Sequence, residues 1–257
     1  MKRRTPGQPT TPTADDFRVR AAAEKRERMR ARLIAATLDA YLVAGNGRPP
    51  VIDDVIRIAE VSRGSFYKYF DSLDEVLAEI GRQMADEMLA SVDRLFAGVD
   101  DAAVRTAAGP LMAMARAAME PRHAAFIARV DFIDFLGGED PRSQIIKRSL
   151  AEGRAQGRLK FESLAAAIDL VVGASLEGAR RILKTRVLDG AYIRETATMV
   201  MRGLGLPRRN AERTVDAAWQ HLEKSRAELH WWKPVAAVPQ TVPGAPALQT
   251  PKETHER

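Results

Sequence analysis

Apolar residues recur at three- and four-residue intervals through most of this 257-residue chain. No segment shows the apolar-polar alternation that is typical of a half-buried β-strand. We therefore predict an all-α protein, in which each helix turns one apolar face toward its neighbours. The helices expected after the N-terminal segment cover approximately 33–44, 52–59, 63–70, 76–95, 101–118, 122–136, 140–155, 162–187, 191–204 and 211–231.

The two ends of the chain have a different composition. Residues 1–16 contain three prolines, several threonines and almost no large apolar side chain, and residues 234–257 contain five prolines without helical or strand periodicity. Such segments bury too little apolar surface to offset the entropy lost on ordering. We expect a basic arm over 1–23 and a Pro-rich tail over 234–257, both disordered in the isolated protein.

Several classes of site are excluded by residue content. The chain has no cysteine, and its four histidines, His123, His221, His230 and His255, are widely separated. We find no Gly-rich phosphate loop, Gly-x-Ser-x-Gly elbow or His-Glu-x-x-His helix. We therefore predict no metal site, no cofactor and no catalytic residues, although an enzyme with a site assembled from distant residues stays open as an alternative.

No segment has the character of a membrane span. The most apolar helical stretch, 164–176, contains Asp169, and the basic N-terminal residues run into Thr-Pro-Gly-Gln-Pro rather than into an apolar signal region. We expect a soluble cytoplasmic protein that does not associate with membranes.

The positive charge is concentrated at the N-terminus. The whole chain has 40 basic and 34 acidic residues, and residues 1–32 hold ten of the basic and four of the acidic ones. The remaining residues are therefore balanced, and the net charge of +6 lies in residues 1–32, that is, in the basic arm and the start of the helix after it. Such asymmetry favours a polyanionic partner, while a solubilising or partly salt-bridged helix explains the arm equally well.

The segment from Val51 to Phe70 has the pattern of two short helices joined by a tight turn. Pro49-Pro50 suits the entrance to a helix, and Glu60-Val61 would form the turn. Ser62 is well placed to cap a second helix that begins at Arg63. Phe66 and Phe70 are four residues apart and would anchor one face of this helix in the core.

The opposite face of the second helix carries residues of another kind. Arg63 and Tyr67 are four residues apart there, as are Gly64 and Lys68, with Ser65 and Tyr69 beside them. Hydrogen-bond donors, together with a glycine that permits close approach, suit a helix in the DNA major groove. We prefer this reading to that of an ordinary pair of core helices.

With these residues, Val51–Phe70 resembles the helix-turn-helix of the TetR family of bacterial transcription regulators. Residues 71–77 resemble the start of that family's fourth helix, and residues 199–205 resemble the end of its last dimerisation helix. The resemblance implies a three-helix DNA-binding domain over 24–72, with its helix-turn-helix at 51–70, and a larger helical effector-binding and dimerisation domain over 73–207. A helix over 208–233 would be an addition to the usual family length.

The resemblance also implies roles for individual residues. Arg63, Gly64, Ser65 and Lys68 would read base edges, and Ser62, Tyr67 and Tyr69 would hold phosphates. Three positions depart from the family pattern, because the family usually has Thr or Ser at Val51, Gly at Glu60 and Lys at Leu73. We expect the basic arm to compensate for the missing phosphate contacts by reaching the neighbouring phosphates or minor groove.

In the family, the helices after the fourth enclose an effector cavity. Flexible apolar walls with a few polar groups would suit a small hydrophobic or amphipathic effector, including an anion if Arg116 or Arg129 points inward. For each candidate residue, the alternative is that its side chain belongs to an ordinary hydrophobic core and lines no cavity. The candidate effector-binding residues are Met84, Met88, Met112, Arg116, His123, Phe126 and Arg129.

The helices over 162–187 and 191–204 carry wide apolar stripes, which we assign to a four-helix interface of a homodimer rather than to a monomer core. The assigned residues are Leu164, Ile168, Val171, Val172, Ser175, Leu176, Ala179, Ile182 and Leu183 in the first helix, and Ile193, Ala197, Val200 and Leu204 in the second.

Together these features predict a sequence-specific transcription regulator, in which two recognition helices about 34–36 Å apart bind a palindromic operator. The resemblance favours a repressor that is released from DNA by its ligand. Two alternatives to this repressor stay open. One is a ligand-independent or activating regulator of the same fold, and the other is an architectural DNA binder.

Overall fold

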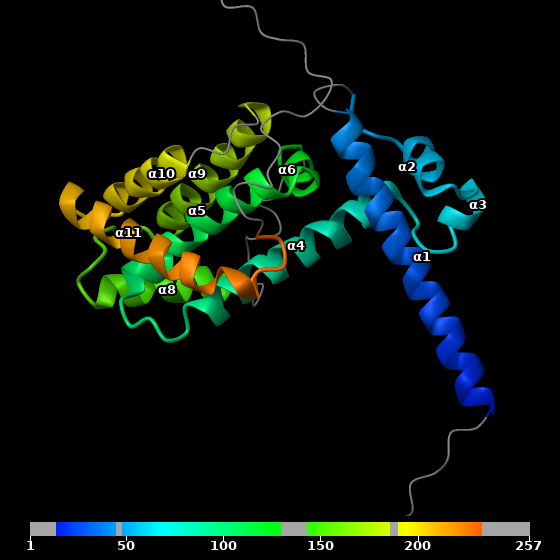
Figure 1. Ribbon diagram of the computed structural model, residues 1–257, viewed down its shortest axis with the longest axis horizontal. Coiled ribbons are helices and arrows are strands. Elements are labelled where there is room, and N and C mark those ends of the chain that lie inside the picture. The colour runs from blue at the N-terminus through cyan, green and yellow to red at the C-terminus, as the bar shows by residue number, and fades with distance from the viewer. Residues whose placement is uncertain (1–13, 45–47, 130–142, 186–189, 233–257) are drawn as a thin grey trace, which may run out of the picture. The chain divides into compact units, whose positions relative to one another are not determined.

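The computed structural model describes residues 14–44, 48–129, 143–185 and 190–232. These residues form helices and no β-strand, which confirms the predicted all-α class. None of the helices they form is both long and apolar enough to cross a membrane. The helices are α1 Ala14–Ala44, α2 Ile52–Ala59, α3 Arg63–Phe66, α4 Leu73–Leu95, α5 Ala102–Met119, α6 Pro121–Ile127, α8 Ser143–Ala155, α9 Leu164–Thr185, α10 Gly190–Gly203, α11 Arg208–Ser225 and the 3₁₀ helix η1 Arg226–Glu228 (Figure 1).

The chain divides into two compact units, Met1–Gly81 and Arg82–Arg257, with the boundary inside α4. The boundary that the resemblance suggested lay nine residues earlier, at the start of this helix. Ser72 begins α4 as its cap, since its hydroxyl accepts the Glu75 N–H at 3.1 Å while the Glu75 carboxylate accepts the Asp71 N–H at 2.7 Å.

The first helix is longer than predicted. We expected residues 1–23 to be disordered, but α1 already begins at Ala14, so this expectation is wrong for residues 14–23. Residues 14–32 are rich in Ala, Arg and Glu, which are strong helix formers, and Glu24 pairs with Arg28 one turn later at 3.5 Å. Helix propensity here outweighs the lack of a buried face. Residues 1–13 and the Pro-rich tail lie outside the described residues.

The first unit is built around α1, α2, α3 and the start of α4. Its core contains Leu33, Ala36, Ala40 and Tyr41 from α1, Val55 and Ala59 from α2, Phe66 and Phe70 from the α3 segment, and Val76 and Ile80 from α4. The apolar spacing seen in the sequence therefore gives each of these helices one buried face.

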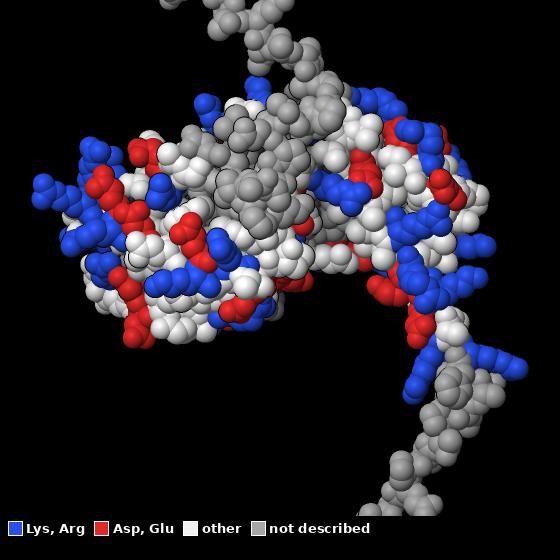
Figure 2. All heavy atoms as spheres, viewed as in Figure 1, with Lys and Arg blue, Asp and Glu red and all other residues white. Residues whose placement is uncertain are grey.

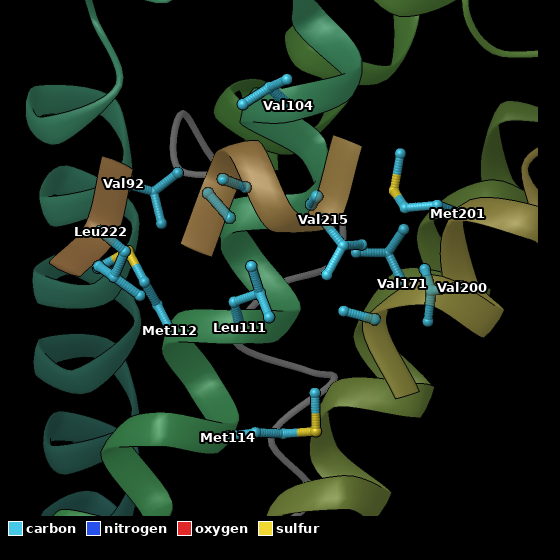
Figure 3. Close-up of a cluster of buried hydrophobic side chains, with 14 of the residues drawn as sticks. Val92, Val104, Leu111, Met112, Met114, Val171, Val200, Met201, Val215 and Leu222 are labelled. Atoms are coloured by element: carbon cyan, nitrogen blue, oxygen red, sulfur yellow. The ribbon is translucent and has the colours of Figure 1, made fainter. Parts of the chain in front are cut away.

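The second unit packs around α5, which contacts α6, α8, α9, α10 and α11 and is buried along almost its whole length (Figure 1). Figure 3 shows apolar side chains from α4, α5, α9, α10 and α11 in one cluster. Met112 and Leu222 both belong to this cluster, so α11 is an integral part of the unit.

The chain after α11 also packs onto this core. Trp231 is buried, Trp232 is half-buried, and the Trp232 ring lies 5.6 Å from that of Trp231 and 6.1 Å from that of Trp219. His221 in α11 contacts the carbonyl oxygen of Leu95 at 2.7 Å. The tryptophan pair thus closes one side of the second unit's own core.

The apolar stripes that we assigned to a homodimer interface are largely internal. Ile193, Ala197, Val200 and Leu204 are buried within the single chain. So are Val171, Val172, Ser175, Leu176, Ala179 and Ile182 of α9, while Leu164, Ile168 and Leu183 are half-buried. This residue assignment is therefore wrong, because the stripes face α5 and neighbouring helices of the same chain.

Candidate nucleic-acid interface and ligand cavity

The turn between α2 and α3 depends on one left-handed residue. Glu60 has φ 50° and ψ 47°, and among the described residues it is the one non-glycine with positive φ. The N–H of Val61 reaches back to the carbonyl of Ile56 at 3.0 Å, which closes the end of α2. The TetR pattern has glycine at this position, and the left-handed geometry that favours glycine is present here with glutamate in its place.

We expect Glu60→Gly to raise the free energy of unfolding by about 1 kcal/mol, because glycine adopts this conformation without the steric penalty of a Cβ. The Glu60 carboxylate also lies 3.4 Å from Arg32, but this pair is solvent-exposed and contributes little. Urea denaturation would measure the change. Glu60→Ala is the control, since it removes the ion pair and keeps the Cβ; stabilisation of the alanine variant to the same extent would contradict the argument.

Ser62 begins α3 as predicted. Its hydroxyl accepts the N–H of Ser65 at 3.1 Å, and the two serine hydroxyls lie 2.9 Å apart. The regular α-helix covers only Arg63–Phe66, shorter than the predicted 63–70. Beyond it, the N–H of Lys68 bonds to the carbonyl of Ser65 and that of Tyr69 to the carbonyl of Phe66, so the turn tightens toward 3₁₀ geometry.

The predicted aromatic anchor is confirmed. Phe66 and Phe70 are almost fully buried, with ring centroids 6.0 Å apart. Arg30 of α1 fixes the end of this segment, since its guanidinium lies 4.3 Å from the Phe70 ring, donates to the Tyr69 carbonyl at 2.8 Å and pairs with Glu79. Arg30 therefore serves the internal structure of the unit, although the charge count placed it in the basic arm.

The opposite face of the α3 segment is open. Ser62, Arg63, Gly64, Tyr67 and Lys68 are exposed. A Cβ placed on Gly64 would have only the Ser62 hydroxyl within range, at 4.0 Å, so this surface allows close approach. Two further candidates, Ser65 and Tyr69, are half-buried. Over the first unit, Figure 2 shows Lys and Arg side chains along α1 and around α2 and α3, with acidic side chains interspersed.

One of the exposed cations already has a partner. The Arg63 guanidinium donates to Asp53 of α2 at 2.7 Å, and both side chains are more than half exposed. The hydrogen bond and the charge of Asp53 raise the pKa of Arg63 above its ordinary value. Arg63 is thus held toward α2 in the free protein, and a base contact would have to replace or share this pairing.

Val51 and Leu73 are the two other positions that depart from the family pattern, and both lack the polar side chain that the family usually has there. Val51 is about half exposed and precedes α2, where the Asp54 carboxylate accepts the Val51 N–H at 3.1 Å. That backbone hydrogen bond is the main reason why the pKa of Asp54 is lowered. Leu73 is half-buried at the start of α4. The side chains of Val51 and Leu73 have no hydrogen-bond donor to offer a phosphate.

The second unit contains a cavity of about 110 Å³ between α4, α5, α6, α8 and α9. Four of the predicted effector residues line it: Met84, Met88, Arg116 and His123. The other three do not line it: Met112 and Phe126 are fully buried in packing contacts, and Arg129 lies outside the lining. Sequence reasoning missed Thr106 and Ser175, which also line it.

Arg116 lies at the centre of a charged cluster on this wall. Only 3% of its side chain is exposed, and it donates to Glu120 at 2.7 Å, to Glu87 at 2.9 Å and to His123 Nε2 at 2.8 Å. His230 approaches Glu87 at 3.4 Å. Burial, followed by the charge of Arg116, lowers the pKa of His123 to about 4, so this histidine is neutral at pH 7.

The protonation of His123 follows from its partners. A guanidinium can only donate, so Nε2 is the acceptor and the proton of the neutral ring lies on Nδ1. Nδ1 faces the Glu120 carboxylate at 3.3 Å. Both ring nitrogens of His123 are therefore engaged with Arg116 and Glu120.

No protein-family model matches the sequence, and no curated protein matches it. Solved structures do match. RolR without ligand is 21% identical over 72% of this chain and 95% of its own, with a TM-score of 0.55. RolR in complex with resorcinol is 21% identical over 75% of this chain and 95% of its own, with a TM-score of 0.50. ECA1819, a TetR-family transcriptional regulator from Pectobacterium atrosepticum, is 23% identical over 70% and 96%, with a TM-score of 0.49.

The likeness to RolR spans both units and nearly the whole of the RolR chain. It shows that this chain has the RolR fold. Together with the helices and turn described above, it confirms the all-α fold that the resemblance in Val51–Phe70 implied.

Proposed function

We propose that this protein is a TetR-family transcription regulator that binds DNA through the α3 segment and has no catalytic activity. The observation that carries the proposal is the exposed face of Arg63, Gly64, Tyr67 and Lys68 behind a fully buried Phe66 and Phe70. A helix held from one side and solvent-exposed on the other can enter the major groove without a change in its backbone. The RolR fold supports this reading.

Selection of bound duplexes from a random pool tests the proposal. A homodimeric regulator should enrich a palindrome whose half-sites lie about one helical turn apart. It should bind this duplex about a thousandfold or more tighter than a random one, whereas an architectural DNA binder would show little difference. Lys68→Ala should weaken binding while helical content stays unchanged. Full affinity in both Lys68→Ala and Tyr67→Ala would mean that another surface contacts DNA.

We propose that the homodimer forms through the outer faces of α9 and α10. Because the assigned stripes are internal, the interface has to use other residues. Leu170 of α9 and Met199 of α10 are large apolar side chains that stay 38% and 61% exposed in the single chain. Gly203 lies against Leu170 and leaves this surface without a protruding side chain. The mass of the protein in solution would show whether the dimer exists.

We propose that a small molecule in the cavity of the second unit relieves repression. A ligand that binds better to the conformation with separated recognition helices would shift the population away from DNA, since only differential affinity can move this equilibrium. RolR, whose fold this chain shares, has been solved with the small molecule resorcinol, which supports a ligand-binding role for this chain. Release of the selected duplex on ligand addition would indicate repression relieved by ligand.

The N-terminal arm offers a separate prediction. Residues 2–20 include five basic and two acidic side chains, and we propose that they contact the phosphates that Val51 and Leu73 cannot hold. Deleting them should weaken binding and flatten the plot of log affinity against log salt by about 0.9 for each phosphate that is no longer neutralised. Deletion of residues 234–257, in which two basic residues balance two acidic ones, is the control. An unchanged slope after the first deletion would remove the arm from the interface.

A further inference from the structure

We propose that the cavity of the second unit selects an uncharged single-ring molecule that carries a hydroxyl group and donates its hydrogen to the wall. The inference rests on the proposed function and names the class of its ligand. It follows from three features of the wall: the balance of charge, the direction of the hydroxyl hydrogens and the volume enclosed.

The charge balance disfavours an anion. The cationic side chains of the lining are Arg105 and Arg116. Arg105 pairs with Glu152 and also donates to the carbonyl of Val99. Arg116 faces the carboxylates of Glu87 and Glu120. Two guanidinium groups thus meet three carboxylates, and the remaining titratable lining residue, His123, is neutral at pH 7. An anionic ligand would have to break one of these pairs. The carboxylate that lost its partner would then repel the negative charge of the ligand.

The donors of this cluster are also engaged. Arg116 donates to Glu87, Glu120 and His123, and the Nδ1 proton of His123 faces Glu120. A ligand carbonyl or ether that needs a donor would therefore compete with charge-assisted hydrogen bonds, which are about twice as strong as neutral ones. The polar groups of this cluster are therefore already paired with one another.

The buried hydroxyls of the wall offer oxygen atoms as acceptors. Thr106 donates its hydroxyl hydrogen to the carbonyl of Ala102 at 2.8 Å, and Ser175 donates its own to the carbonyl of Val171 at 2.6 Å. A hydroxyl has one hydrogen and two lone pairs, so each oxygen can still accept. Ser149, half-buried on α8, can serve as donor or acceptor. The two buried hydroxyls therefore match a ligand that donates.

A proline adds to this preference. Pro110 lies inside α5, one turn after Thr106. Because proline has no N–H, the carbonyl of Thr106 lacks the amide donor that residue 110 supplies in a regular helix. Gly109, just before the proline, lines the cavity without a side chain. The carbonyl of Thr106 is therefore an additional acceptor beside the lining residues Thr106 and Gly109.

The volume sets the size of the ligand. The rest of the lining is apolar, with Met84 and Met88 from α4, Ile145 and Ile146 from α8, and Val172 and Leu176 from α9. At about 110 Å³ the cavity is close to the engineered apolar cavities of about 150 Å³ that take up benzene. Methionine side chains can adjust to the shape of a ring.

Calorimetry on the full-length protein at pH 7 tests the proposal with phenol, its methyl ether anisole and benzoate. Phenol is neutral and donates, anisole has the same ring and only accepts, and benzoate is an anion. Phenol should bind at least about fivefold tighter than anisole, since a hydrogen bond contributes about 1 kcal/mol. Benzoate should give no measurable heat. Binding of phenol that is no tighter than that of anisole or of benzoate, or no binding of phenol at all, would overturn the proposal.

A double variant locates the contact. Combining Ser175→Ala with Thr106→Val should bring the affinity for phenol down to that for anisole, because each substitution removes one acceptor oxygen. Thr198→Val is the matched control, since Thr198 is buried on α10 and does not line the cavity. Equal loss of phenol binding in the control and in the double variant would refute the assignment. Melting temperatures of the ligand-free variants would show that each one is folded.

Duplex binding by the same preparations keeps the two proposals apart. Selective duplex binding without a preference for phenol would overturn the ligand inference and leave the DNA-binding function standing. A phenol preference that depends on Ser175 and Thr106, in a protein that binds no duplex, would support the cavity chemistry while the proposed function fails.

Discussion

Phe66→Ala is expected to lower the free energy of unfolding of the first unit by about 3–5 kcal/mol, the usual cost of truncating a buried phenylalanine. Phe66 is fully buried, and its ring contacts those of Phe70 and Tyr67. The described core of this unit holds few side chains of comparable size, so the loss should melt the α3 segment at ambient temperature. Selective DNA binding should disappear with it.

The positions of the tryptophans allow the unfolding of the two units to be measured separately. All three tryptophans, Trp219, Trp231 and Trp232, lie in the second unit. Tryptophan fluorescence therefore follows the second unit, while circular dichroism follows the helices of both. Phe66→Ala should move the dichroism midpoint to lower urea and leave the tryptophan transition in place.

The neighbouring aromatic residue supplies the control. Tyr67 is 48% exposed, so Tyr67→Ala should change stability by less than about 1 kcal/mol and still weaken DNA binding. Comparing Phe66→Ala with Tyr67→Ala distinguishes a residue that holds the helix in place from one that contacts DNA. A wild-type midpoint in Phe66→Ala would mean that the aromatic anchor is not what fixes the α3 segment.

The helix-turn-helix was predictable because its determinants are local. The cap at Ser62, the tight turn at Glu60-Val61 and the spacing of Phe66 and Phe70 act within a few residues of one another, and the structure confirms each of them. A four-residue spacing fixes which side chains share a face, whatever the rest of the chain does. The open face of Arg63 and Lys68 follows from that geometry.

The features that sequence reasoning missed depend on which helices become neighbours. Ile193 and Val200 form a clear stripe, but periodicity cannot tell whether it faces α5 of the same chain or a second copy. In the same way, Met88 lines the cavity while Met112 lies in the core, although both have helical spacing and the same side chain. Thr106 and Ser175 gave no signal, because isolated hydroxyls on apolar helices usually bond to their own backbone.

Arg63→Ala is expected to weaken binding to the selected duplex by about 5- to 150-fold, which corresponds to the 1–3 kcal/mol of discrimination that a bidentate arginine-guanine pair supplies. Arg63 is the most specific of the candidate base contacts, because its guanidinium can donate two parallel hydrogen bonds to one base edge. Binding to a random duplex should fall much less, since only the attraction of one charge to the phosphates is lost.

Asp53 complicates this contact in a way that can be tested. Its carboxylate lies 2.7 Å from the Arg63 guanidinium and presents a negative charge at the same surface. Asp53→Asn should therefore raise the affinity for selected and random duplexes alike, because it removes both the competing partner and a charge that repels phosphate. The expected sign is opposite to that of Arg63→Ala, so the two variants cannot be confused with a general loss of folding.

Arg57→Ala is the matched control for the arginine. Arg57 lies on α2, is exposed and pairs with Asp54 at 3.3 Å, so its removal deletes one positive charge from the same unit without touching the α3 face. Titration of labelled duplexes at two salt concentrations should show Arg57→Ala weakening selected and random binding by the same factor. If Arg63→Ala did the same, Arg63 would be a phosphate contact, and the bases would have to be read by Lys68 or by the close approach at Gly64.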